Sequence, residues 1–151
     1  PTPSRFAKFT PDESYTATYS LGRADFDHTQ NIDSPDGKYV GEYGIGIPAS
    51  QGLLHDDMNK AIAIEVYLFD KSDDRQLAST KRTLLSLYAD DKRTEFTRDR
   101  QSQPPIVAQP NTNFQLEGVL YLLDCQIKQV DYTPEGYFKH VIVELVLKRK
   151  S

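Results

Sequence analysis

The sequence predicts a mainly β protein: an antiparallel β-sandwich or open barrel with one short surface helix near residues 90–100. Segments that alternate apolar and polar residues recur along the chain, and turns rich in Gly, Pro and Asp separate them. Nine tyrosines and seven phenylalanines, with no tryptophan, suit strands better than helical bundles. A chain of 151 residues can bury about two thirds of its unfolded surface, which is enough for the core of one domain.

The central strand of the sheet is predicted over residues 61–70, AIAIEVYLFD. Successive side chains point to opposite faces of a strand. One face of this segment is purely aliphatic, and the other is aromatic and half-polar: Ile62, Ile64, Val66 and Leu68 lie opposite Glu65, Tyr67 and Phe69. This pattern is typical of an antiparallel strand that is buried more on one face than on the other.

The first third of the chain predicts two more strands. Residues 14–21 alternate tyrosine with threonine and serine. Residues 22–37 are expected to form one long loop, ending in the sequence Ser34-Pro35-Asp36-Gly37 that is typical of a type I turn. Residues 38–47 predict a strand whose three glycines indicate bulges or a close approach of another backbone.

The middle of the chain is less regular. Residues 77–89 fit a helical and a strand pattern equally well, and their threonines favour the strand. Residues 90–100 predict the single helix, because acidic residues begin the segment and arginines end it. Three prolines predict that residues 101–113 run extended along the edge of a sheet.

The end of the chain predicts a long hairpin. Residues 114–130 and 137–148 form its strands, and the sequence DYTPEG between them forms its turn. The apolar face of the first strand changes along its length, so Gly118 is the expected place of a bend or bulge. Residues 14–150 are therefore predicted to form one β-rich domain, preceded by a linker or arm over residues 1–13.

Charge and composition exclude several classes of protein. The net charge of −4 argues against binding to nucleic acid, which usually requires a basic excess. The only cysteine, Cys125, excludes an internal disulfide and a cysteine-rich zinc site, and its apolar surroundings predict a buried core residue. No apolar run approaches the roughly 20 residues of a membrane span. Because the chain begins at Pro1 rather than Met, we expect it to be either a processed chain or, in preference, a piece of a longer protein.

Acidic loops predict a possible cation site. Oxygen-rich loops at one end of a sandwich can bind Ca²⁺, which takes six to eight oxygen ligands. If the loops meet, five carboxylates would converge: Asp70, Asp73, Asp74, Asp25 and Asp27. Solvated turns explain the same residues, and no EF-hand loop is present. Apart from this Ca²⁺, the sequence predicts no cofactor.

The histidines give a third hypothesis, a hydrolase that uses a loop histidine. His28 could pair with Asp25 or Asp27, and His55 with Asp56, as an acid–base pair. His140 is expected to have a structural role at the start of the last strand. No HExxH motif, nucleophile elbow or phosphate-binding glycine loop accompanies these histidines. The sequence therefore identifies no catalytic residue and no small-molecule substrate.

Four segments resemble a family of uncharacterised bacterial proteins: SYTATYSL, GEYGIGI, EVYLFDKSDDR and VIVELVLK. In that family G-E-x-G-I-G-I followed by E-V-W-L-F-D-K is the most recognisable part, and such a domain follows membrane-spanning segments. Tyr67 stands here in the place of the family's Trp, and Tyr43 in the place of a Cys or similar residue. The similarity covers most of residues 14–148. It implies a soluble domain of unknown function that is tethered to a membrane, and it supplies no catalytic residue or ligand.

The leading hypothesis from the sequence is a non-catalytic interaction or sensory module with a protein partner, near a membrane through an upstream anchor. Its expected binding surface is the glycine-rich strand over residues 38–47, which could leave a backbone edge open for strand addition.

Overall fold

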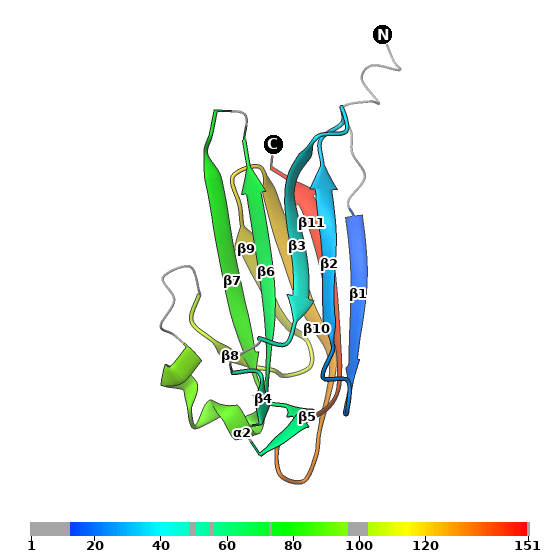
Figure 1. Cartoon of the computed structure of the whole chain (residues 1–151), viewed down its shortest axis with the longest axis vertical. Coiled ribbons are helices and arrows are strands. Elements are labelled where there is room, and N and C mark those ends of the chain that lie inside the picture. Colours follow the sequence, from blue (N-terminus) through cyan, green and yellow to red (C-terminus); the bar gives the residue numbers. More distant parts are fainter. Residues whose placement is uncertain (1–12, 49–50, 55, 73, 97–102, 151) are drawn as a thin grey trace.

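A computed structural model describes residues 13–48, 51–54, 56–72, 74–96 and 103–150. Two sheets pack face to face (Figure 1), one with strand order β1-β11-β10-β9 and the other with order β2-β3-β6-β7-β8. The predicted β-sandwich is confirmed, and the sheets do not close into a barrel. The strands are β1 (Glu13–Ser20), β2 (Asp27–Asp33), β3 (Tyr39–Gly46), β4 (Leu53–Leu54), β5 (Asp57–Ala61), β6 (Ala63–Lys71), β7 (Leu77–Leu85), β8 (Ile106–Val107), β9 (Thr112–Glu117), β10 (Tyr121–Tyr132) and β11 (Phe138–Arg149).

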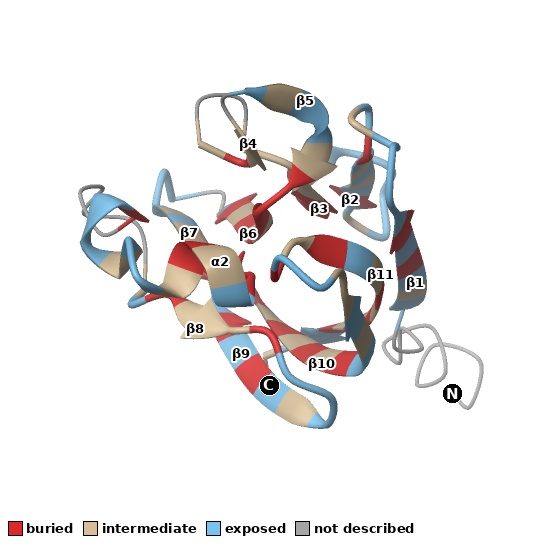
Figure 2. Cartoon of the chain, turned by 90° about the horizontal axis from the view of Figure 1, so that it is seen from below, coloured by how far each residue is buried: buried red, intermediate tan, exposed pale blue. Residues whose placement is uncertain are grey.

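The predicted central strand is confirmed as β6, which lies between β3 and β7 in the five-stranded sheet. Its aliphatic face is fully buried at Ile64, Val66 and Leu68, whereas Tyr67 on the opposite face is half-buried. The apolar side chains of one face thus form the layer between the two sheets, where the buried residues concentrate (Figure 2).

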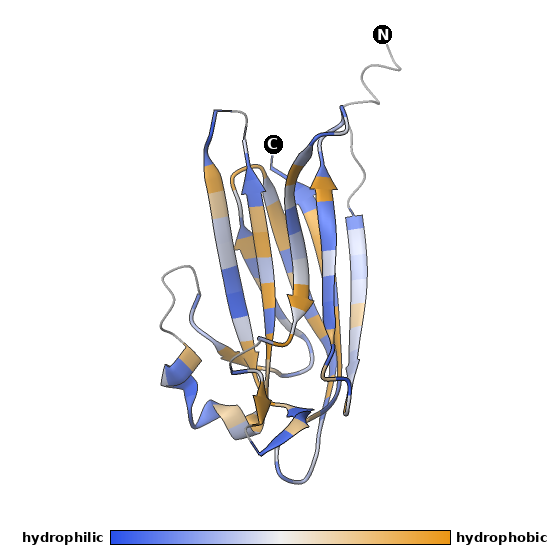
Figure 3. Cartoon of the chain, in the orientation of Figure 1, coloured by the Kyte–Doolittle hydropathy of each residue, from blue (hydrophilic) through white to orange (hydrophobic). Residues whose placement is uncertain are grey.

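The other side of this core comes from the long hairpin of β10 and β11, also as predicted. Alternate residues of β11, such as Val143 and Leu145, point into the core beside Leu123 and Ile127 of β10. The residues between them face outward and are half-buried or exposed, and hydrophilic and hydrophobic residues alternate along the long strands (Figure 3). The four-stranded sheet therefore has one apolar inner face and one largely polar outer face, which carries the candidate site.

The prediction of one long loop over residues 22–37 is wrong, because β2 forms inside it. The strand sequence DHTQNID is polar, and Ile32 is its only buried residue. β2 is an edge strand that pairs only with β3, so the sheet requires few apolar side chains from it. The expected arm over residues 1–13 lies outside the described residues except for Glu13, which begins β1.

The prediction of a single bent strand over residues 114–130 is also wrong. β9 and β10 are separate antiparallel strands, and the chain reverses direction between Glu117 and Tyr121. Gly118, predicted as a bend, lies in this turn. The change of apolar face that the sequence shows there is the change from one strand to the next.

The predicted helix is shorter and earlier than expected. An α-helix, α2, covers Leu87–Asp90, and a 3-10 helix covers Arg93–Phe96. The hydroxyl of Ser86 caps α2 by accepting a hydrogen bond from the backbone N–H of Ala89 at 3.1 Å. Residues 97–100 of the predicted helix lie outside the described residues.

The predicted edge crossing is confirmed between residues 103 and 107. The backbone N–H of Gln103 donates to the carbonyl of Lys81 at 2.8 Å, and β8 then pairs with the end of β7 in parallel. The Arg82 guanidinium donates to the Pro104 carbonyl at 2.9 Å. This segment covers the free edge of β7, so this edge is closed to strand addition along part of its length.

Three hairpins of the fold use the same turn. In each, the backbone N–H of a Ser or Thr donates to the carbonyl of the residue four positions later. Its own carbonyl accepts from the N–H of the residue three positions later, and that residue has a positive φ. The turns begin at Ser34, Ser72 and Thr133. The positive-φ residue is glycine in two of them, Gly37 and Gly136, but it is Arg75 in the third, with φ of 69°.

Replacing Arg75 by Gly is expected to stabilise the protein by about 0.5–1 kcal/mol, because only glycine adopts this conformation without a steric cost from Cβ. Thermal unfolding monitored by circular dichroism would show a midpoint about 1–4 °C higher. The matched variant Gly37→Ala, at φ of 86° in the equivalent turn, should lower the midpoint, although no atom lies within 4 Å of the added methyl. Shifts of the same sign in both variants would contradict this explanation.

Candidate functional site

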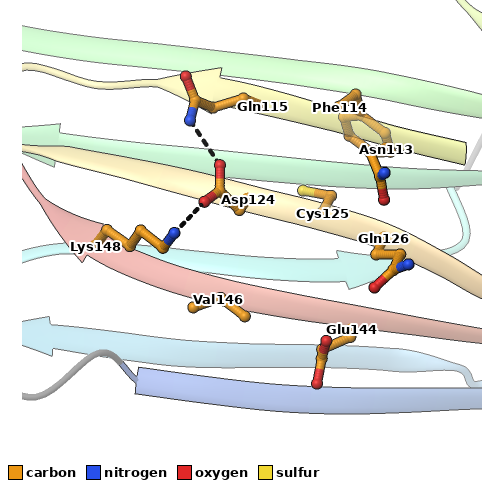
Figure 4. Close-up of a pocket in the computed structure, with 9 residues that line it drawn as sticks. All are labelled: Asn113, Phe114, Gln115, Asp124, Cys125, Gln126, Glu144, Val146 and Lys148. Atoms are coloured by element: carbon orange, nitrogen blue, oxygen red, sulfur yellow. Dashed lines mark hydrogen bonds and ion pairs between the residues drawn. The ribbon is translucent and has the colours of Figure 1, made fainter.

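A groove of about 560 Å³ lies on the outer face of the four-stranded sheet (Figure 4). Its volume is in the range of roughly 300–1,000 Å³ that is usual for ligand sites. Strands β9, β10 and β11 supply the lining residues, which are mostly amides and charged side chains: Asn113, Phe114, Gln115, Asp124, Cys125, Gln126, Glu144, Val146 and Lys148.

The strand register places these side chains in rows across the sheet. Asn113 of β9 lies opposite Gln126 of β10, and Gln126 lies opposite Glu144 of β11, which in turn lies opposite Thr16 of β1. Two positions along each strand, the next row consists of Gln115, Asp124, Val146 and Ser14. Neighbouring strands lie about 4.8 Å apart, so one row extends about 14 Å across four strands.

Asp124 is the centre of a hydrogen-bonded network in the groove. It accepts a hydrogen bond from the Gln115 amide at 2.6 Å, and the Lys148 ammonium lies 2.8 Å from its other oxygen. The hydrogen bond from Lys148 lowers the pKa of Asp124 most, with a further contribution from Gln115, so this carboxylate stays ionised at neutral pH. Its two partners fix its orientation in the middle of the sheet face.

The second acidic side chain of the groove, Glu144, also has a basic partner. The Lys128 ammonium lies 3.5 Å from a Glu144 oxygen. Both carboxylates of the lining are thus paired with a lysine, and the groove has no excess of negative charge.

Two amides of the same row have no side-chain partner. Within the described part of the chain, neither Asn113 nor Gln126 makes a side-chain hydrogen bond. Each carries two N–H donors and one carbonyl acceptor. Gln126 is half-buried and Asn113 is exposed, so both amides are accessible from the groove. These two side chains are free to bind a ligand.

Cys125 lies beneath the groove and is confirmed as a core residue, with 2% of its surface exposed. Burial raises the pKa of its thiol far above the ordinary value, and the negative charge of Asp124 adds to this effect. Its thiol contacts the Leu123 carbonyl at 3.6 Å. A thiol that is neutral and covered is a poor nucleophile.

The structure does not bring together the four predicted Ca²⁺ ligands that it describes, Asp25, Asp27, Asp70 and Asp74. Asp27 pairs with Gly46 at one end of β3, whereas Asp70 pairs with Gly41 five residues along the same strand. At about 3.3 Å per residue this places them about 16 Å apart along the strand direction. Asp73 lies outside the described residues. In the part of the chain that the structure describes, no three acidic, histidine or cysteine residues are grouped to hold a metal ion.

Three of the predicted Ca²⁺ ligands, Asp25, Asp70 and Asp74, interact with groups of the protein instead. Asp25 forms an exposed ion pair with Arg23 at 3.4 Å, and Asp74 accepts a hydrogen bond from Ser72. Asp70 is completely buried. Its carboxylate accepts three backbone N–H bonds from the turn between β9 and β10: from Val119 at 2.7 Å, Leu120 at 2.8 Å and Tyr121 at 3.0 Å. Among the described residues the expected convergence of the acidic loops is therefore wrong, and the carboxylate of Asp70 instead joins the two sheets.

The histidines do not form the predicted acid–base pairs within the described residues. The Nδ1 atom of His28 lies 2.8 Å from the Tyr15 hydroxyl, and its ring packs edge-on against Phe26. The contact with Tyr15 joins β1 to β2, which belong to different sheets. His55 lies outside the described residues. His140 lies on β11, 3.8 Å from the Asp131 carboxylate and within hydrogen-bonding distance of Gln129.

The predicted open edge at residues 38–47 is wrong, because β3 lies inside its sheet between β2 and β6. Its glycines instead permit close packing within the sheet. A Cβ atom on Gly41 would lie 2.2 Å from the carbonyl oxygen of Phe69, and one on Gly44 would lie 2.3 Å from that of His28. The close backbone approach that the glycines predicted is therefore confirmed. The approaching backbone belongs to neighbouring strands of the same sheet rather than to a strand of another protein.

Sequence reasoning missed the groove, although a signal was present. Polar residues alternate with apolar ones through TNFQLE and YLLDCQIK, but only the apolar half was used to predict strands. No family model, curated protein or solved structure matches this chain. Among the described residues no helix is long and apolar enough to cross a membrane.

Proposed function

We propose that this domain is a non-catalytic binding module whose ligand site is the groove on the outer face of the four-stranded sheet. The observation that carries the proposal is a row of side chains with unused hydrogen-bonding groups in a hollow of ligand size. The two unpartnered amides, Asn113 and Gln126, lie side by side on neighbouring strands.

The rigidity of the site supports the same function. The groove lies on the two longest strands of the sheet, β10 and β11, each of 12 residues, rather than on loops. Binding to side chains that are already held in place avoids much of the entropy cost of ordering them. In the described lining the thiol of Cys125 is covered, and Asp124, Lys148 and Glu144 are each engaged in an ion pair, so the arrangement favours binding over covalent chemistry.

We also propose that the module lies beside a bacterial membrane, held by a segment upstream of Pro1. The support for this is the resemblance of residues 14–148 to membrane-tethered proteins. The full-length gene sequence tests it: an apolar segment of about 20 residues before the domain supports the tether, and its absence contradicts it.

An NMR titration tests the binding function. The ¹⁵N-labelled domain is mixed in turn with neutral oligosaccharides, peptides and nucleotides, and the backbone amide shifts are followed. We expect at least one class to shift the resonances of the groove strands β9, β10 and β11, and to be recovered chemically unchanged. Shifts confined to other parts of the molecule, or conversion of the ligand, would overturn the proposal.

A further inference from the structure

We propose that the ligand of the groove is a neutral oligosaccharide that lies across strands β9 to β11. This inference rests on the proposed binding function and names the chemical class of its ligand. Three properties of the groove lead to it: its hydrogen-bonding groups, its charge balance and its floor.

The hydrogen-bonding groups of the groove match those of a sugar. A hydroxyl group both donates and accepts, and a side-chain amide offers two N–H donors and one carbonyl acceptor in one plane. Asn113 and Gln126 present such amides side by side, with the carboxylate of Glu144 next in the row. Adjacent hydroxyls of a sugar ring can bond an amide or a carboxylate at two points at once.

The charge balance favours a ligand without charge. Asp124 is paired with Lys148, and Glu144 with Lys128, so the groove has no excess charge of either sign that would attract a charged ligand. Each of these four side chains keeps about a third or more of its surface exposed, so the ion pairs themselves contribute little energy. A neutral polyhydroxyl ligand can instead use the lone pairs and N–H groups that these pairs leave over.

The floor of the groove argues against a protein partner. Tight binding between proteins usually depends on large apolar or aromatic side chains that fill well-packed pockets. Here the outward-facing apolar side chain of the lining is Val146, and the only aromatic ring, Phe114, is 9% exposed. Val146 can contact the C–H face of one sugar ring. Because the lining offers no exposed ring for stacking, binding depends on hydrogen bonds and is expected to be weak, on the order of 1 mM.

The test is an NMR titration of the full chain of 151 residues with soluble neutral hexasaccharides of glucose, xylose and mannose. We expect at least one of them to give saturable shifts that centre on Asn113, Gln126 and Glu144. The double variant Asn113→Ala with Gln126→Ala should bind at least tenfold more weakly. The control variant Asn31→Ala removes an exposed amide from the edge strand β2 of the other sheet and should bind normally.

Both variants must keep the far-ultraviolet circular dichroism and melting temperature of the parent, which we expect because Asn113, Gln126 and Asn31 lie outside the core. Groove shifts with peptides but with none of the sugars would overturn the inference and leave the binding function standing. Sugar-induced shifts away from the groove would also overturn it, as would a loss of sugar affinity in the Asn31→Ala variant as large as that in the double variant. If neither sugars, peptides nor nucleotides shift the resonances of the groove, both the inference and the proposed function fail.

Discussion

Replacing Asp70 by Asn is expected to lower the free energy of unfolding by about 2–4 kcal/mol. The carboxylate is fully buried and accepts backbone N–H bonds from Val119, Leu120 and Tyr121. An Asn side chain has one oxygen, and its NH₂ group would face backbone donors that it cannot accept from. At least one buried N–H would lose its partner, and the attraction between the amide dipoles and a negative charge would be lost.

Chemical denaturation at neutral pH measures this effect, with an expected fall of the thermal midpoint of about 5–10 °C as a second readout. The matched control is Asp74→Asn, in the hairpin that follows β6, where the carboxylate is exposed and, among the described residues, accepts its side-chain hydrogen bond from Ser72 of the same turn. We expect the control to change stability little. Equal losses in the two variants would show that the three backbone bonds of Asp70 contribute nothing specific.

Asp70 also illustrates where sequence reasoning reached its limit. Its place at the end of the central strand, before two more aspartates, predicted an exposed metal ligand. The hydrogen-bond partners that give it a different role lie about fifty positions later in the chain. They are backbone groups, which every residue carries, so no side-chain pattern marks them.

The strands were predictable where burial imposes a period of two. β6, β10 and β11 each bury alternate side chains against the opposite sheet, and that burial requires an apolar residue at about every second position. β2 was missed because an edge strand is held mainly by its backbone hydrogen bonds to one neighbour, and these place little demand on side chains. The β9–β10 turn was missed for a related reason: the sharp reversal at Gly118 is set by a contact with Asp70 rather than by a local turn sequence.

The groove could not be predicted from the sequence for a different reason, which is the strand register. The sequence shows that Asn113, Gln126 and Glu144 face outward, but it does not show the strand register that places them in one row. Register between β9 and β10 depends on the turn that joins them, and that turn was itself not predicted. The candidate site could therefore be recognised only after the sheet was assembled.

Gly118→Ala is expected to destabilise the protein by about 1–3 kcal/mol, and the cost should depend on Asp70. A Cβ atom on Gly118 would lie 2.4 and 2.5 Å from the two carboxylate oxygens of Asp70. The backbone of Gly118 has no positive φ, and the three atoms nearest to the added Cβ all belong to the Asp70 carboxylate, so this contact is what requires glycine here. The added methyl would push the carboxylate away from the three N–H groups that it binds.

A double-mutant cycle with Asp70→Ala separates this cause from a general packing defect. Once the carboxylate is removed, the methyl on residue 118 has room, so Gly118→Ala should cost less by about 1–2 kcal/mol than it does beside Asp70. Gly41→Ala is the matched control, because its methyl would meet the Phe69 carbonyl oxygen at 2.2 Å and the Asp70 Cα at 2.8 Å, which the Asp70→Ala change leaves in place. Gly41→Ala should lower the free energy of unfolding by the same amount whether residue 70 is Asp or is replaced by Ala. If the effects of Gly118→Ala and Asp70→Ala on the free energy of unfolding are additive in equilibrium denaturation, glycine is required at position 118 by something other than the carboxylate. If these two substitutions couple, and Gly41→Ala and Asp70→Ala do not, the two sheets are joined at this end by the Asp70 carboxylate packed against Gly118.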